Sequence, residues 1–141
     1  MKIKIRVKSG KWIDAPAFPT SHPALFVTPE RYRELKDWTD ARGKLRFKHG
    51  RARFLKDQWT ITHRPSGYSI IFGTFELEEA RKLAELFAKS SIPWKKLRSK
   101  RDAKQYARQH RAIMRKFFRD GGSVDEPGDV YLTGGTIRTV A

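Results

Sequence analysis

The chain has 141 residues, of which 38% are hydrophobic and 12% aromatic, so it is too apolar for a disordered chain and suits one domain with a modest core. Its 31 Lys and Arg against 15 Asp and Glu give a net charge of +16, far more than solubility requires, which favours a polyanionic partner. The absence of cysteine excludes disulfides, thiolate metal sites and a cysteine nucleophile.

The first predicted elements are strands. Residues 2–8 alternate Lys or Arg with aliphatic side chains, which predicts a half-buried strand with a cationic outer face. Ser9-Gly10 predicts a turn, and Trp12-Ile13 begins a return strand. Three prolines between residues 14 and 23 predict an extended loop. Residues 25–27 are expected to form a short strand or to insert their apolar side chains into the core.

A helix is predicted from Pro29 to about Arg42. Thr28-Pro29-Glu30 combines a hydroxyl N-cap, a proline at the first helical position and an acid in the first turn. Gly43 is the expected C-terminal stop. The apolar residues at three-residue steps would form its buried stripe: Tyr32, Leu35, Trp38 and Ala41.

The middle of the chain predicts a small sheet and a second helix. Between residues 44 and 75, basic and apolar residues alternate, with turns expected at His49-Gly50 and at 64–67. The strands would be a basic one after residue 50, then Gln58–His63 and Tyr68–Phe72. Thr74 would cap an amphipathic helix that ends near residue 90, because Pro93 follows.

The segment 93–119 carries the strongest signal, with eleven basic residues and one acid. Its apolar residues recur at three- and four-residue steps, which predicts an amphipathic helix over 97–119 that docks by one side. Gly121-Gly122 would end it, and the tail would form a hairpin across Gly134-Gly135 or stay loose. Five bases at steps of four and three form a second stripe: Lys104, Arg108, Arg111, Arg115 and Arg119.

These elements predict an α+β fold with a small antiparallel sheet packed against three helices, the last one strongly basic. We expect a single basic domain over 1–120, containing a sheet-plus-helix unit at 51–89 and the basic helix at 97–119. Residues 121–141 would be a Gly/Thr-rich acidic tail or hairpin.

Residues 68–80, in which Gly-Thr-Phe leads into Glu-Glu-Ala, resemble the strand-to-helix passage of Apetala-two-type and integrase arm-binding DNA-binding domains. The resemblance is local, over about residues 51–89. It implies a three-stranded sheet that lies in the major groove of DNA. The contact side that it implies consists of Arg51, Arg53, Lys56, Trp59, Thr60, His63 and Arg64.

The charge pattern predicts a nucleic-acid-binding protein that is not an enzyme, with DNA favoured over RNA. The five bases of the helical stripe are the first candidates for phosphate contact, followed by Arg51, Arg53, Lys56 and Arg64. Trp59 either stacks on a base or packs in the core. Two alternatives remain: a small phage or mobile-element inhibitor that binds a host nucleoprotein complex, and a structural subunit of a ribonucleoprotein. The sequence does not indicate an oligomeric state.

The four histidines predict no catalytic or metal site. His49 and His63 lie on adjacent predicted strands with only Asp57 nearby, which is a weak basis for a metal or acid–base site. His110 beside the apolar stripe is expected to be packed or partly buried. We therefore expect no cofactor and no metal. No stretch is apolar over the roughly 18 residues that a membrane span needs, so we expect a soluble, cytoplasmic protein with no membrane partner.

Overall fold

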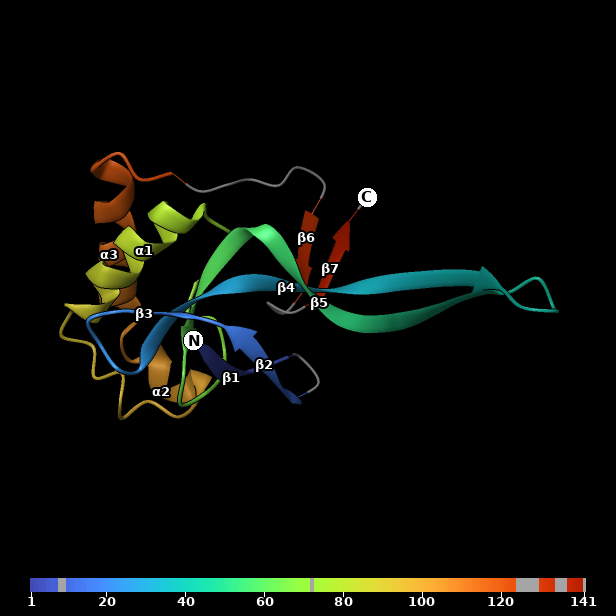
Figure 1. Ribbon diagram of the computed structural model, residues 1–141, viewed down its shortest axis with the longest axis horizontal. Coiled ribbons are helices and arrows are strands. Elements are labelled where there is room, and N and C mark those ends of the chain that lie inside the picture. Colours follow the sequence, from blue (N-terminus) through green and yellow to red (C-terminus); the bar gives the residue numbers. More distant parts are fainter. Residues whose placement is uncertain (8–9, 72, 124–129, 134–136, 141) are drawn as a thin grey trace.

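The computed structural model describes residues 1–7, 10–71, 73–123, 130–133 and 137–140, with the side chains of 32–36, 49–52, 100 and 130–140 excepted. It combines antiparallel sheets with three helices, which confirms the α+β class at that level. Figure 1 shows a body that holds the helices and a long two-stranded ribbon that extends away from it.

The N-terminal hairpin forms as predicted. Strand β1 (Lys2–Arg6) pairs antiparallel with β2 (Trp12–Pro16), with Ile5 opposite Ile13. Ile3 and Ile5 are buried, Lys2 and Lys4 are exposed and Arg6 is half-buried, because alternate side chains of a strand point to opposite faces. These aliphatic residues form a small core with Phe26 from the long ribbon.

The predicted helix from Pro29 to Arg42 is wrong. Strand β4 (Leu25–Thr39) runs through this segment and pairs antiparallel with β5 (Leu45–His63), while β3 (Phe18–Pro19) pairs with the beginning of β4. Pro29, which lacks an N–H, sits beside a register shift, where the ladder tolerates it. A long ladder of inter-strand hydrogen bonds thus prevails over local capping signals.

Strand β5 is also longer than predicted. It continues through His49-Gly50, where a turn was expected, and the register with β4 shifts between His49 and Ala52. Gly43, the expected helix stop, has φ +77° in the hairpin turn between β4 and β5. Of the predicted strand over 68–72, the described residues form only an isolated bridge, Ser69 with Thr62, and a second bridge joins Trp59 to Phe75 beyond it.

The predicted turn at 64–67 is confirmed, and it seats the sheet on the N-terminal hairpin. Gly67 donates to the His63 carbonyl at 2.7 Å and accepts from the Arg6 backbone N–H at 2.8 Å. Gly67 has φ +76°, and a Cβ there would lie 2.6 Å from the Trp12 ring. Only glycine therefore fits this turn without strain.

The main core lies between the body's part of the sheet and the helices. Helix α1 (Leu77–Ala88) buries Ala80, Leu83, Ala84 and Phe87 at the predicted helical spacing. It begins after Glu76, and Thr74 does not cap it. Trp94 packs edge-on against Phe87 at 5.9 Å, and its Nε1 donates to the Phe87 carbonyl at 2.9 Å.

The predicted basic helix is two helices. Helix α2 (Lys100–Lys104) is capped by Ser99, whose hydroxyl accepts from the Asp102 N–H at 3.3 Å, and helix α3 (Ala107–Arg119) follows. The break lies at Tyr106, whose φ of −107° and ψ of 13° are not helical. Helix α3 packs against α1, and the Gly121-Gly122 stop is confirmed.

The C-terminal segments pair as the hairpin alternative predicted. Strand β6 (Val130–Thr133) is antiparallel to β7 (Ile137–Val140), with Val130 opposite Val140. Strand β7 lies against β4 (Figure 1). Residues 134–136, which include the expected Gly134-Gly135 connection, lie outside the described residues.

Candidate nucleic-acid interface

The outer part of the β4–β5 ribbon, residues 31–54, is the arm. Its register runs from Arg31 opposite Phe54 to Thr39 opposite Leu45, which spans about 30 Å at roughly 3.4 Å per residue. Figure 1 shows that the arm leaves the body on the side away from α1 and α3. It is therefore accessible from several sides.

Asp40 organises the turn at the end of the arm. Its Oδ1 accepts from the backbone N–H groups of Arg42 and Lys44 at 2.9 and 3.0 Å, and its Oδ2 accepts from Arg46 Nε at 3.0 Å. The hydrogen bond from the Lys44 N–H and then that from Arg46 hold the pKa of Asp40 below its ordinary value of 3.8. The turn is thus pre-organised at neutral pH.

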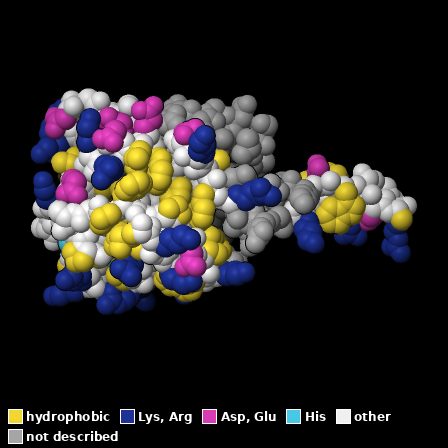
Figure 2. All heavy atoms as spheres, viewed as in Figure 1, with side chains coloured by type: hydrophobic (Ala, Val, Ile, Leu, Met, Phe, Trp, Pro, Cys, Tyr) yellow, Lys and Arg dark blue, Asp and Glu magenta, His cyan; other side chains and the backbone are white. Residues whose placement is uncertain are grey.

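The tip of the arm, residues 37–48, combines cations with exposed apolar side chains. Every residue of the tip is exposed except Asp40, which is half-buried. Trp38, Leu45 and Phe47 are 48%, 54% and 59% exposed. In Figure 2, both hydrophobic and Lys or Arg side chains reach the surface of the arm. The basic residues of the tip are Arg42, Lys44, Arg46 and Lys48.

Arg31 at the root of the arm is not available to a ligand. It is 1% exposed, and its backbone N–H donates to Glu30 Oε1 at 3.0 Å. Burial lowers the pKa of Arg31, and the charge of Glu30 opposes that shift. Its Nε and Nη1 have no hydrogen-bond partner among the described residues.

Helix α3 holds four of the five bases of the predicted stripe, because Lys104 ends α2 instead. Arg108, Arg111, Arg115 and Arg119 are all exposed. Arg119 lies 3.8 Å from Asp120, an exposed and weak contact. Within the described part of the chain, the other three arginines pair with no acid.

The apolar side of α3 meets the body, although less completely than predicted. Phe117 is buried and packs edge-on against Phe75 at 5.9 Å, whereas Phe118 is 43% exposed. His110 is half-buried, as expected, with its Nε2 donating to the Ile70 carbonyl at 2.6 Å and its ring 4.9 Å from that of Phe87.

The second group of predicted contact residues lies on β5 and beyond it. Arg53 and Lys56 are exposed near the root of the arm, and the side chain of Arg51 lies outside the described ones. Trp59 is half-buried with its ring 5.4 Å from that of Phe18. That packing makes Trp59 part of the core and agrees with the core alternative.

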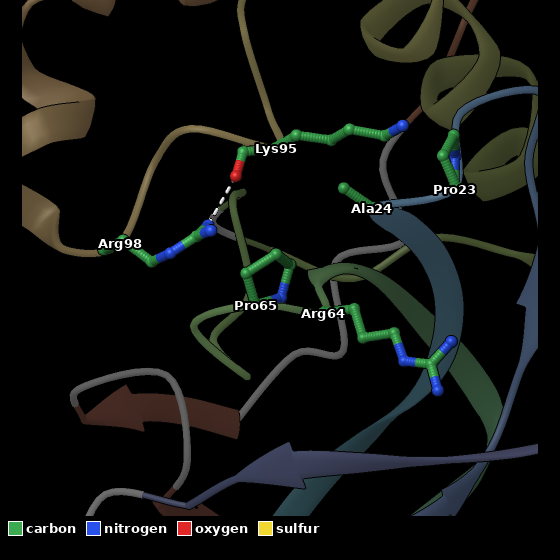
Figure 3. Close-up of a pocket in the computed structure, with 6 residues that line it drawn as sticks. All are labelled: Pro23, Ala24, Arg64, Pro65, Lys95 and Arg98. Carbon is green, nitrogen blue, oxygen red and sulfur yellow. Dashed lines mark hydrogen bonds between the residues drawn. The ribbon is translucent and has the colours of Figure 1, made fainter.

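Arg64 belongs to a different place, a shallow pocket of about 290 Å³ on the body. Its guanidinium lies over the Phe26 ring at 5.5 Å, and Arg98 donates to the Leu97 carbonyl at 3.1 Å and to that of Lys95. In Figure 3 the Arg98 head lies beside the Lys95 carbonyl, whereas the Arg64 head points away from it. The lining residues are Pro23, Ala24, Arg64, Pro65, Lys95 and Arg98.

The structure does not bring the basic helix and the arm together. Helix α3 and the arm lie at opposite ends of the long axis of the molecule (Figure 1). Trp38 lies on the surface, whereas the predicted helix would have placed it in a buried stripe. The alternation of Lys44, Arg46 and Lys48 with Leu45 and Phe47 was the available signal.

His63 is held by hydrogen bonds within the fold. Its Nε2 lies 2.6 Å from the Trp94 carbonyl and its Nδ1 2.9 Å from Ser66 Oγ. Among the described residues, no three His, Asp or Glu side chains are grouped to hold a metal ion. No described helix has both the length and the apolar character needed to cross a membrane.

Comparisons with protein-family models, with curated proteins and with solved structures found no match to this chain. Its function therefore has to be argued from the surfaces described above.

Proposed function

We propose that this chain binds nucleic acid, DNA in preference to RNA, without catalysing a reaction. The observation that carries the proposal is the basic arm that stands clear of the body. A two-stranded ribbon is one of the two elements that the major groove of B-DNA, about 12 Å wide, admits. Residues 42–56 of the arm and its root contain seven bases and no acid. Such a ribbon suits contact with a phosphate backbone.

Helix α3 supplies the second contact surface of the proposal. In this arrangement it is the strongly basic last helix, held on the body by Phe117 and presenting Arg108, Arg111 and Arg115 to the ligand. A guanidinium grips phosphate with two parallel hydrogen bonds. Because α3 and the arm lie far apart, a nucleic acid that touches both has to follow the length of the body.

The resemblance to Apetala-two-type and integrase arm-binding domains implies the same ligand class, but the described residues of 51–89 do not form the three-stranded sheet that it implies, because β5 is one strand up to His63 and Ser69 forms only an isolated bridge. The exposed part of the contact side that the resemblance implies includes Arg53 and Lys56. Lys56 therefore joins the proposed contact surface, beside the tip.

The alternative partner is a protein within a host nucleoprotein complex, which this chain would inhibit. Leu45 and Phe47, more than half exposed on one strand, favour it, because an apolar protein groove would cover them. A structural subunit of a ribonucleoprotein would use the cationic surfaces on folded RNA instead.

The test is to titrate the protein with duplex DNA, single-stranded DNA and a structured RNA at two salt concentrations. We expect log affinity to fall linearly with log salt concentration, with a slope of about −0.9 for each duplex phosphate contacted. Five contacts would therefore give a slope of about −4 or steeper. The strongest binding is expected for a DNA. Tightest binding to the structured RNA would favour the ribonucleoprotein alternative. Micromolar or weaker binding to all three at low salt would contradict the proposal.

A further inference from the structure

The tip of the arm has two unlike faces. Alternate residues of a strand point to opposite faces, and residues directly opposite in an antiparallel pair share a face. The register places Trp38 opposite Arg46, and Phe47 opposite Asp37. The cationic face consists of Trp38, Lys44, Arg46 and Lys48, and the apolar face of Asp37, Thr39, Leu45 and Phe47.

Trp38 is an exposed aromatic side chain in a cationic setting. It is 48% exposed, and among the described residues no aromatic ring pairs with its indole and no cation lies over it. Leaving that much apolar surface in water is unfavourable, at roughly 25 cal/mol for each Å². A ligand that covers it has to offer a flat apolar surface with negative charge around it.

The charges on this face favour a nucleotide over an apolar protein groove. Lys44 and Lys48 have no acidic partner among the described residues, and Asp40 engages Arg46 at the turn. A base supplies the flat surface and its flanking phosphates supply the negative charge. Stacking of bases on aromatic side chains beside a basic groove is a general mode of single-strand binding.

Trp38 distinguishes unpaired bases from a continuous duplex. In a duplex both faces of each base are already stacked, so an indole reaches a base face only after a step is unstacked. At a gap, a bulge or a single strand, one face is free. We infer that Trp38, set among Lys44, Arg46 and Lys48, is the stacking platform for an unpaired base, so that the arm selects gapped or single-stranded DNA. This inference rests on the proposed function.

The experiment compares the full chain on a continuous duplex and on the same duplex with a short single-stranded gap. We expect the gapped DNA to bind about 5- to 20-fold more tightly. Trp38→Ala is expected to lower affinity for the gapped DNA by about 5- to 100-fold, down to the level of the continuous duplex. Trp38→Phe keeps an aromatic face and is expected to stay within about threefold of the wild type.

The opposite face of the tip supplies the matched control. Leu45→Ala with Phe47→Ala removes two comparably exposed side chains and leaves the cationic face unchanged, so affinity should stay within about twofold. Equal, salt-dependent binding of the wild type to both DNAs would overturn the stacking role of Trp38 and leave the proposed function standing. A loss of affinity in the Leu45→Ala, Phe47→Ala variant, without a loss in Trp38→Ala, would have the same consequence. The absence of salt-dependent binding to any nucleic acid would contradict the proposed function itself.

Discussion

His63 shows how a single side chain is committed to structure. It is 4% exposed, and because a carbonyl only accepts, its Nε2 carries the proton donated to Trp94. The Nδ1 then accepts from the Ser66 hydroxyl. Burial lowers the pKa of His63, the hydrogen bond to Trp94 opposes this, and the charges of Arg98 and His22 add to the lowering. The imidazole is therefore neutral in the folded protein at pH 7.

This state of His63 predicts a pH dependence of stability. A folded-state pKa below the ordinary 6.5 contributes stability that is present above pH 6.5 and is lost as the pH falls through the folded-state pKa. We expect the free energy of unfolding, measured by urea denaturation, to fall between about pH 7.5 and about pH 5. His63→Gln should flatten that fall.

His22 has to be separated from His63 in this experiment. Burial and then the charge of Lys95 lower the pKa of His22, so its contribution has the same sign. His22 accepts from the Ala24 N–H through Nδ1 at 3.0 Å, and His22→Gln measures its share. Parallel pH profiles for wild type and His63→Gln would show that His63 is not the titrating group.

At the scale of the element, local periodicity predicted α1 and the first strand well. Helix α1 follows from its pattern because Ala80, Leu83 and Phe87 recur at helical spacing, although Thr74 does not cap the helix. The break at Tyr106 was not predicted. The segment on both sides of it has helical periodicity, and only the packed backbone shows where the helix is interrupted.

Helix α3 predicts a measurable share of the salt dependence. Arg108→Ala with Arg111→Ala removes two exposed cations, so the slope of log affinity against log salt should become less steep by about 2. The matched control is Lys82→Ala on α1 with Lys89→Ala at its C-cap. The surface of α1 carries acids such as Glu79, which lies 3.3 Å from Lys82. That control should leave the slope within about half a unit. Equal slopes for all three proteins would remove α3 from the interface.

At the scale of the whole molecule, the tip is separate from the core. All of its side chains but that of Asp40 are exposed, and the buried hydrophobic residues among the described ones come from the body. Replacing residues 37–47 by Asn-Gly, which joins the paired Lys36 and Lys48, should change the free energy of unfolding by less than about 1 kcal/mol. The same change should lower nucleic-acid affinity by about tenfold or more.

A charge-only variant distinguishes the shape of the arm from its charge. Lys44→Gln with Arg46→Gln and Lys48→Gln keeps the ribbon and removes three of the four cations of the tip, so most of the loss in affinity should persist. Full affinity in the shortened protein, together with a native urea transition, would show that the tip has no part in binding.

The sequence by itself determined the parts whose signal is local: the alternating strand at the N-terminus, the apolar stripes of α1 and α3, and the turn at 64–67. It also determined the uneven distribution of positive charge along the chain, because that distribution follows from the sequence whatever the fold. Only the tertiary structure decided that Pro29–Thr39 is a strand and that Trp38 lies at an exposed tip. The N-cap signal at Thr28 is local, whereas the ladder with β5 joins residues up to 38 positions apart, such as Leu25 and His63. Pairing at that distance is energetically decisive, and no short window of sequence contains it.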